Sequence, residues 1–458
     1  MDRDVHDEYW DARIETMSKE EMSALQLAKL KKQVVYNYNN SLLYQRKFRE
    51  AGMKPEDVQS FEDFQRIPVT DKTEQKETQA ESLEEFGHPF GPGTITCAPQ
   101  EKIIRINATS GTTGTPTLYA LTQHDVDIMN ELQGRRLWMV GIRPGHRILQ
   151  GLSLSMFAGG LPLSQGIMHT GACAIPVGAE GGTKRVLEFI EITRPHAFFT
   201  TPSFAQYLLE QCPKVIGKPA SELGIKWLFP VGEPGAGNIE MRKLLSKGFG
   251  GARICDQTGG AHSGQGEECL EPPEVYSGMH WTAPDYCLLE LVDPKTKKSV
   301  EIRDGAIGEQ VMTFLDWEGT PFQRYAYADL LQVFTSPCNC GRPSLRFKII
   351  GRVDDLLIVK GVNVFPEAIK KEILRFAPRV TGYFKIVLDK PGPSVTPPLK
   401  IKIEYGHGMQ ENDIKTLEDE MVKAFKEVLR VTPQFMWVPP ESIPRESRKT
   451  KLTEVLSL

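Results

Sequence analysis

Several features are scarce or missing in this sequence, and each absence argues against a class of protein. Eight cysteines in 458 residues are too few for a disulfide scaffold, so we expect a reducing compartment. No stretch of about 18 apolar residues is present, which argues against a transmembrane helix. The first residues, MDRDVHDEYW, lack the basic and apolar regions of a signal peptide. The sequence therefore predicts a soluble, cytoplasmic protein with no membrane partner.

An excess of positive charge is also missing. The formal net charge is −4, which is unfavourable for binding nucleic acid through phosphate contacts. Hydrophobic residues make up 40% and charged residues 25% of the chain, as in ordinary globular proteins. A chain of this length exceeds one ordinary core, so we expect roughly two to four domains.

The first three quarters of the chain combine helices with short apolar strands. An apolar stripe at three- and four-residue spacing predicts a helix over residues 19–50. From about Ile103, short apolar runs alternate with helical stretches such as Lys184–Ile192 and Ser203–Gln211. The apolar runs are IIRINATSGTTG, HRILQGLSLS, ACAIPVG, HAFFTTP and IKWLFPVGE. This alternation predicts an α/β body with mainly parallel sheets covered by helices.

The residues from about Gly351 onward are predicted to form a small α+β unit. Leu357–Val359 is expected to be a strand, and Pro366 opens a helix that runs through Arg375. Alternating apolar residues predict two strands, over 384–388 and 399–403, and an amphipathic helix follows over 414–428. We therefore expect a body over residues 1–350 and a C-terminal lid over residues 351–458.

A loop rich in glycine and hydroxyl side chains follows the first apolar run. Its residues are Thr109, Ser110, Gly111, Thr112, Thr113 and Gly114. Glycines let the backbone approach a ligand closely, and clustered hydroxyls and amides can surround phosphate oxygens. Thr115 stands where a kinase or GTPase P-loop has lysine, so a P-loop is not predicted. The alternative is an ordinary surface turn of the same composition.

Five segments, in order, resemble the motifs of the adenylate-forming superfamily, which includes acyl-CoA synthetases, luciferases and adenylation domains of peptide synthetases. The loop resembles the SSGTTGxPT signature, and PVGEP at 230–234 resembles the adenine-contacting turn. The other three are RYAYADL at 324–330, GRVDD at 351–355 with KGVNVFP at 360–366, and IPR at 443–445 followed by Lys449. The GVNVFP run and the stretch from LLYQRKFREAG to IPVTDK are similar to the phenylacetate–CoA ligase branch.

The resemblance covers nearly the whole chain and implies an ATP-dependent carboxylate–CoA ligase. Such an enzyme joins an aryl or aryl-like acid to AMP as an acyl-adenylate and then passes the acyl group to CoA. The implied cofactors are ATP, Mg²⁺ and CoA, the partners are these and a small carboxylic acid, and a homodimer is compatible with them. Both half-reactions pass through highly charged states, so cations and backbone amides should dominate catalysis.

The resemblance also implies roles for single residues. The loop would hold the β- and γ-phosphates, Asp329 the ribose hydroxyls, and Arg352 the ribose or a phosphate. Lys449 would donate to the forming adenylate, with Lys451 as the alternative because alignment near a chain end can slip. Taken alone, Lys449 lies in a solvated basic run, and Asp329 could be a turn residue. The remaining ATP-site residues would be Gly232, Glu233, Pro234, Asp256 and Gln257, with Thr258 as a further catalytic residue.

A moving lid is also implied. Asp354 lies where the lid of the family pivots, and rotation there would replace Lys449 by a CoA tunnel. The tunnel residues would be Lys360, Gly361, Val362 and Asn363. The acyl pocket would be lined by Phe157, Gly159, Gly160 and Pro202, although Phe157 fits the core equally well.

One segment departs from the family pattern. The family has a Y-G-x-S/T-E segment whose glutamate helps to hold Mg²⁺. This chain reads Cys255-Asp256-Gln257-Thr258-Gly259, so glycine replaces that glutamate. Asp256 or Glu267 could compensate.

The cysteines suggest a structural zinc site. Cys338 and Cys340, followed by Gly341, form a compact knuckle suited to thiolate ligation. Cys255 and His262 are expected near the phosphate end of the site and would complete four ligands. Cys269 could replace either of them, and the alternative is that the cysteines are unliganded apolar residues.

Two other functions fit the same motifs. An adenylating enzyme could pass the acyl group to a carrier-protein thiol, an amine or a protein cysteine, or could adenylate a cofactor. A non-catalytic nucleotide-binding sensor could use the fold without the chemistry. Asp329, Arg352 and Lys449 argue against a sensor, whereas the missing glutamate argues for it.

Overall fold

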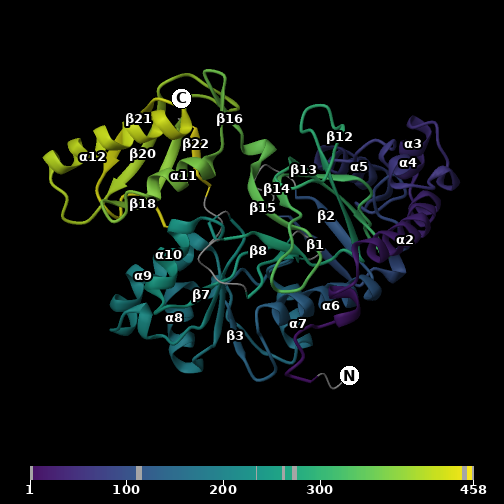
Figure 1. Ribbon diagram of the computed structural model, residues 1–458, viewed down its shortest axis with the longest axis horizontal. Coiled ribbons are helices and arrows are strands. Elements are labelled where there is room, and N and C mark those ends of the chain that lie inside the picture. Colours follow the sequence, from purple (N-terminus) through teal and green to yellow (C-terminus); the bar gives the residue numbers. More distant parts are fainter. Residues whose placement is uncertain are drawn as a thin grey trace.

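A computed structural model describes residues 4–109, 116–233, 235–259, 264–270, 276–445 and 451–455. It consists of a large body and a smaller C-terminal unit (Figure 1). The C-terminal unit lies on the side of the body formed by α9 and α10, whereas the N-terminal helices lie on the opposite side. Within the described ranges, no helix combines the length and apolar character needed to cross a membrane.

The N-terminal stretch forms two helices where the sequence predicted one. α2 (Lys19–Asn40) ends at Ser41, whose backbone is extended, and α3 (Leu42–Glu50) begins directly after it. The Ser41 hydroxyl accepts a hydrogen bond from the Tyr44 amide and donates one to the Thr94 carbonyl at 2.6 Å. Because a serine cap stabilises a helix start, the chain breaks at Ser41 although the apolar spacing continues across it.

A five-stranded parallel sheet confirms the predicted alternation of strands and helices. Its order is β4-β3-β5-β6-β7. The strands are β3 (Arg147–Gln150), β4 (Cys173–Pro176), β5 (Ala197–Thr200), β6 (Trp227–Pro230) and β7 (Arg253–Ile254). The helices between them are α7 (Leu161–His169), α8 (Gly182–Thr193), α9 (Pro202–Ile216) and α10 (Ile239–Gly248). Since parallel strands are joined by crossovers, all five carboxyl ends lie along one edge.

The body also contains an eight-stranded antiparallel sheet, which the sequence pattern did not indicate. Its order is β12-β11-β13-β14-β15-β10-β9-β8. The strands are β8 (Gln257–Gly259), β9 (Gly264–Glu267), β10 (Met279–Trp281), β11 (Cys287–Val292), β12 (Ser299–Val300), β13 (Ile307–Phe314), β14 (Tyr325–Phe334) and β15 (Arg346–Arg352). β11 and β13 are buried on both faces, so they lack the alternation that reveals a half-exposed strand.

The remaining elements of the body surround these sheets. A hairpin of β1 (Arg105–Ala108) and β2 (Leu118–Leu121) leads into α6 (Gln123–Met139), which contacts α7 and β9. α5 (Lys72–Phe86) is a longer helix of 15 residues. The short helices are α1 (Ala12–Glu15), α4 (Phe61–Gln65), η1 (Pro55–Asp57), η2 (Gln100–Lys102), η3 (Ala179–Gly181) and η4 (Ala220–Glu222).

The C-terminal unit has its own sheets and apolar core. After the turn η5 (Val353–Asp355) come β16 (Leu357–Val359), β17 (Val362–Val364), α11 (Pro366–Leu374), β18 (Val380–Leu388), β19 (Ser394–Val395) and β20 (Leu399–Tyr405). The chain ends with α12 (Glu411–Ala424), the π-helical η6 (Phe425–Leu429), β21 (Pro433–Val438) and β22 (Thr453–Val455). The four-stranded sheet packs Phe384, Ile401 and Ile403 against Leu417 and Met421 of α12. The strands and helices predicted for this unit are therefore confirmed.

A buried ion pair joins α6 to the connection between β10 and β11 of the antiparallel sheet. Arg135 donates two hydrogen bonds to Asp285, at 2.6 and 3.0 Å, and both side chains are buried. We expect Asp285→Asn to lower the free energy of unfolding by about 3 kcal/mol, because a buried guanidinium loses the nearer and more buried of its two counter-charges. Glu50→Gln is the control, since its pair with Arg46 is exposed, and it should cost under about 1 kcal/mol. Urea denaturation of both variants measures the difference, and equal losses would contradict this role for Asp285.

Candidate active site

Four of the predicted segments lie just beyond the carboxyl ends of parallel strands. The segment with Phe157 and Gly160 follows β3, Pro202 follows β5, Glu233 follows β6 and Asp256 follows β7. Open α/β sheets bind ligands along this edge, where the strand order changes direction. Segments separated by about a hundred residues in the sequence are thus brought to one edge by topology alone.

The predicted phosphate loop lies between two antiparallel strands, β1 and β2, in the sequence. Residues 110–115 lie outside the described part, so Ser110, Gly111, Thr112, Thr113 and Gly114 are not placed. Their two flanks are tied together, since the Thr109 amide donates to the Thr117 carbonyl at 3.0 Å and their hydroxyls are 2.9 Å apart. The Ala108 amide donates to the Met156 carbonyl at 3.2 Å, which places this flank, at the end of β1, beside the predicted acyl segment.

The acyl segment folds as a tight turn. The Gly160 amide donates to the Phe157 carbonyl at 2.8 Å, and a Cβ on Gly160 would meet the Ser155 carbonyl oxygen at 2.0 Å. The side-chain amide of Gln150, at the end of β3, donates to the carbonyls of Gly159 and Gly160. The Phe157 ring is half-buried, which leaves it able to line a pocket.

The predicted adenine turn packs against the start of α9. The Ser203 amide, in the first turn of α9, donates to the Glu233 carboxylate at 2.7 Å. Gly232 has φ +89°, which glycine adopts without strain. A Cβ on Gly235 would lie 2.8 Å from Pro202, so the turn and the helix are in close contact. Pro234, between these two glycines, lies outside the described residues.

Asp256 lies in a buried polar network between the two sheets. The Tyr276 hydroxyl donates to the Asp256 carboxylate, and the Asp256 amide donates to Glu268 at 3.0 Å. Glu268 accepts two hydrogen bonds from Arg242, each 2.9 Å long. Burial raises the pKa of Asp256 to about 6, although the Tyr276 hydroxyl bond opposes this shift. Nothing in the sequence pattern singled out Arg242, Glu268 or Tyr276.

The strand that follows carries Gln257 and Thr258, and Thr258 is only half-buried. Gly259 is exposed at the end of β8. Glu267, one of the two candidates to replace the missing glutamate, is paired with Gln257 in the β8–β9 register. It is fully buried with its carboxylate 3.6 Å from the Arg136 guanidinium, and burial raises its pKa well above the ordinary value.

Helix α11 of the C-terminal unit reaches this edge of the body. The ammonium of Lys370 lies 3.6 Å from where a Cβ on Gly235 would be. Burial raises the pKa of Glu367 to about 7, Lys370 opposes the shift, and the charges of Glu233 and Asp256 add to it. The C-terminal unit therefore faces the adenine turn and Asp256 in this conformation.

Three residues with different predicted roles are joined by hydrogen bonds, which we call the Arg352 bridge. Asp329 on β14 is directly opposite Arg352 on β15, and Arg352 donates to Asp329 at 2.8 Å. The same guanidinium donates two hydrogen bonds of 2.8 Å to Asp354. Burial raises the pKa of Asp354, but the bonds and charge of Arg352 outweigh it and leave the pKa below its ordinary value. Arg352 thus links the predicted ribose-binding residue to the predicted hinge.

The predicted CoA turn is a two-residue hairpin between β16 and β17. Val359 pairs with Val362, and Lys360 and Gly361 both have positive φ, +50° and +82°. Two central residues with positive φ define the type of turn that suits a tight hairpin. Gly361 and Asn363 are exposed here.

The tail that carries the predicted catalytic lysine is anchored just before it. Arg445 donates two hydrogen bonds to the buried Glu404, at 2.6 and 2.9 Å, and stacks on Tyr383. Lys449 lies in residues 446–450, outside the described part. The alternative, Lys451, is exposed, and its carbonyl accepts from Lys385 at 2.6 Å.

The predicted zinc ligands are only partly brought together. The ligand atoms that lie within 4.8 Å of one another are those of Cys269, His280, Cys338 and Cys340. The prediction of Cys255 as a ligand needs correction, because its side chain is packed in the apolar cluster with Leu137, Phe199 and Phe229. His262 lies outside the described residues. Cys269 was the considered substitute, whereas His280 was missed because a lone histidine in a strand has no spacing signal.

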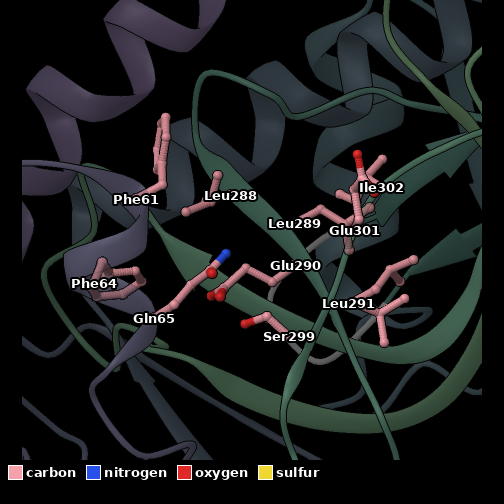
Figure 2. A pocket seen from close by; sticks show the side chains of 11 residues that line it. Phe61, Phe64, Gln65, Leu288, Leu289, Glu290, Leu291, Ser299, Glu301 and Ile302 are labelled. Carbon is pink, nitrogen blue, oxygen red and sulfur yellow. The ribbon is translucent and has the colours of Figure 1, made fainter.

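A separate pocket of about 450 Å³ lies between α4 and the strands β11 and β12. Figure 2 shows Phe61, Phe64 and Gln65 on one side of it and Leu288 to Leu291 on the other. None of the predicted site residues lines it. Its buried Glu290 already pairs with Arg324 at 3.2 Å. We therefore do not assign it to the reaction.

Comparison with known proteins agrees with this arrangement. The family model of the AMP-binding enzymes matches residues 14–309, and that of the AMP-binding enzyme C-terminal domain matches residues 361–453. The chain is 32% identical to the phenylacetate–coenzyme A ligase of Thermus thermophilus, over 97% of this chain and 98% of that protein.

Two solved structures of 2-hydroxyisobutyryl-CoA ligase are also similar, each 27% identical and aligned over 99% of this chain. The postadenylation state with the acyl-adenylate is matched over 93% of its length with a TM-score of 0.89. The thioesterification state, with the adenylate and CoA, is matched over 95% of its length with a TM-score of 0.70. With its motifs gathered at one edge of the parallel sheet, the chain belongs to the AMP-binding enzymes, in the branch of the phenylacetate–coenzyme A ligases.

Proposed function

We propose that this protein is an AMP-forming carboxylate–CoA ligase that activates a small aryl or aryl-like acid. A carboxylate oxygen of the acid attacks the α-phosphorus of ATP, and pyrophosphate leaves. The thiolate of CoA then attacks the acyl carbon, and AMP leaves. The observation that carries the proposal is the convergence of the acyl segment, the adenine turn and Asp256 at one sheet edge, beneath a C-terminal unit joined through the Arg352 bridge.

The nucleotide would lie along this edge. The amides and hydroxyls of the loop at 109–114 would hold the β- and γ-phosphates, and the flanks of this loop are already fixed by the Thr109–Thr117 bonds. The turn at Gly232, Glu233 and Pro234 would contact adenine. Asp329 would accept the ribose hydroxyls, with its carboxylate oriented by Arg352.

Mg²⁺ would enter with ATP as part of the substrate. Of the two carboxylates that could replace the missing glutamate, Glu267 is fully buried beside Arg136 and Asp256 accepts from Tyr276. In this conformation neither carboxylate is free to bind a metal ion at an open site. No step of the proposed reaction is therefore assigned to a protein-bound magnesium ion.

The orientation of the C-terminal unit supports an adenylation-type conformation. The fold matches the postadenylation state of 2-hydroxyisobutyryl-CoA ligase better than its thioesterification state, with TM-scores of 0.89 and 0.70. The two structures represent successive steps of one enzyme, the second with CoA bound, and one rigid conformation could not match both equally. We therefore propose that the unit rotates about Asp354 between the two half-reactions and brings the turn at 360–363 to CoA.

One face of α9 holds the unit in its present orientation. Gln206 donates to the Thr381 carbonyl at 2.7 Å, Glu210 lies 3.7 Å from Arg445, and Lys214 lies 3.0 Å from Glu441. The three α9 residues are four apart and so share one side of the helix. We call these contacts the α9 latch. All three would have to break for the unit to rotate.

Gly259 is exposed and stands where the family has its Mg²⁺-binding glutamate. This replacement favours a second candidate function, a nucleotide-binding protein without catalysis. ATP–pyrophosphate exchange with a panel of phenylacetate, benzoates and short aliphatic acids separates the two. A ligase exchanges pyrophosphate with one class of acid and makes a thioester when CoA is added. Exchange without thioester would indicate another acceptor, and binding without exchange would indicate a sensor.

Lys449→Ala should slow adenylate formation by at least about 100-fold, because a cation positioned on the forming charge is lost. Thioester formation from supplied acyl-adenylate should change far less, since that half-reaction uses the other orientation. Single-turnover assays of both half-reactions measure the split, with Lys451→Ala as the neighbouring control. Equal loss in both half-reactions would assign Lys449 a structural role instead.

Asp354→Pro should keep pyrophosphate exchange and lose most CoA-dependent turnover. Proline fixes φ near −65°, which is compatible with the 3-10 turn at 353–355 but restricts rotation away from it. Asp354→Ala is the matched control, because it also removes the carboxylate that binds Arg352 but leaves the backbone free. If the proline variant makes thioester at the normal rate, the pivot lies elsewhere.

Glu210→Ala should weaken the α9 latch and lower the rate of adenylation by about 3- to 10-fold, as expected for losing a partly buried ion pair. Thioesterification of supplied adenylate should be unchanged or faster. Glu188→Ala on the neighbouring helix α8 is the control, since its pair with Lys184 is exposed. A slower thioesterification in the Glu210 variant would show that the latch does not act on orientation.

A further inference from the structure

We propose that Cys269, His280, Cys338 and Cys340 bind one structural Zn²⁺ ion. The four residues come from three separate segments of the antiparallel sheet: the residues just after β9, the middle of β10 and the connection between β14 and β15. Three cysteines and one histidine are a known ligand set of structural zinc sites. No step of the ligase reaction uses these side chains.

The distances fit a tetrahedral ion. The sulfurs of Cys269 and Cys338 are 3.7 Å apart, and the Cys340 sulfur is 3.3 Å from His280 Nε2. With Zn–S near 2.3 Å and Zn–N near 2.0 Å, tetrahedral geometry separates two sulfurs by about 3.8 Å and a sulfur from a nitrogen by about 3.5 Å. All four ligand atoms lie within 4.8 Å of one another, so one ion can reach each of them.

The histidine is oriented by a second contact. Nδ1 of His280 lies 3.2 Å from the Ser344 hydroxyl on the far side of the ring from the cluster. With the proton on Nδ1 donated to Ser344, Nε2 directs its lone pair at the cysteines. Metal-binding histidines usually carry such an outer hydrogen bond, which fixes the ring and its tautomer.

The CxCG turn is shaped and held by its surroundings. Gly341 has φ +75°, and its amide donates to the Cys338 carbonyl at 3.2 Å, which closes the turn around both thiols. The Tyr9 hydroxyl donates to the Cys340 carbonyl at 3.2 Å and leaves no room for a Cβ on Gly341. The N-terminal segment therefore covers the turn from outside.

Four protein ligands would complete the coordination shell, so the ion would be structural. Cys269 and His280 are buried, and Cys338 and Cys340 are half-buried, which leaves little access for a fifth ligand. Soft thiolates with one imidazole favour zinc over magnesium or calcium, which prefer oxygen ligands.

The ion would brace the strand next to the nucleotide site. Cys269 directly follows Glu268, whose carboxylate accepts the Asp256 amide and pairs with Arg242. The Cys269 carbonyl accepts from Arg253 on β7 at 3.0 Å. His280 pairs with Glu267 across β9 and β10. A fixed Cys269 therefore holds the segment that positions Asp256.

The competing explanation is a disulfide between Cys269 and Cys338, whose sulfurs are neighbours. X-ray absorption at the zinc edge of wild-type protein, purified without a histidine tag, distinguishes the zinc site from the disulfide without any substitution. We expect about one zinc per chain by elemental analysis, with three sulfurs near 2.3 Å and one nitrogen near 2.0 Å. Cys269→Ser and Cys338→Ser should each reduce the zinc content at least about ten-fold.

Cys255→Ser and Cys173→Ser are the matched controls and should keep their zinc, because Cys255 is packed in the apolar core and Cys173 is exposed. Removing the metal from wild-type protein with a chelator should lower its thermal midpoint by several degrees, and added Zn²⁺ should restore it. The proposal is wrong if zinc-free wild-type protein melts at the same temperature with and without Zn²⁺. It is also wrong if Cys269→Ser and Cys338→Ser both keep their zinc, or if peptide mapping finds Cys269 and Cys338 oxidised to each other.

Discussion

The shared direction of five β-strands is the constraint on which the rest of this structure depends. Each parallel strand must be followed by a crossover before the next can join, so the chain leaves the sheet at the same edge every time. The acyl segment, the start of α9, the adenine turn and Asp256 are therefore neighbours although they span residues 157–256. The hairpin at β1 and β2 brings the flanks of the phosphate loop to the acyl segment through one backbone bond, from Ala108 to Met156.

The second sheet adds rigidity and a connection to the lid. Asp329 and Arg352 are paired across β14 and β15, and the same guanidinium binds Asp354 in the turn that leaves the body. The proposed ribose-binding residue and the turn that leads into the C-terminal unit are thus linked through one side chain. On the opposite flank, the α9 latch links the lid to a helix of the parallel sheet. The C-terminal unit is thus held to the body by a charged bridge beside the proposed pivot and by polar contacts along α9.

The interior of the site contains several buried charged groups that lie close to one another. Arg242 satisfies Glu268, Tyr276 donates to Asp256, and Arg136 is close to Glu267. Removing one member of such a network leaves a buried group uncompensated, which costs more than an exposed pair would. The proposed zinc ion would fix the end of the same network at Cys269. It would therefore stabilise both the antiparallel sheet and the edge of the parallel sheet proposed to bind the nucleotide.

Local patterns in the sequence determined the parallel sheet, the C-terminal unit and the order of the motifs. These depend on apolar runs, proline and glycine positions and short contiguous segments, all of which act within a few residues. Tertiary structure decided what depends on contacts between distant segments. The helix ends at Ser41 although the apolar spacing continues, because the Ser41 hydroxyl donates a hydrogen bond to the distant Thr94 carbonyl. The buried strands β11 and β13 lacked alternation, so the antiparallel sheet was missed. Cys269 and His280 lie beside Cys338 and Cys340, where Cys255 and His262 were expected, because burial of Cys255 in the core and pairing of His280 across β10 and β15 have no signature in residue spacing.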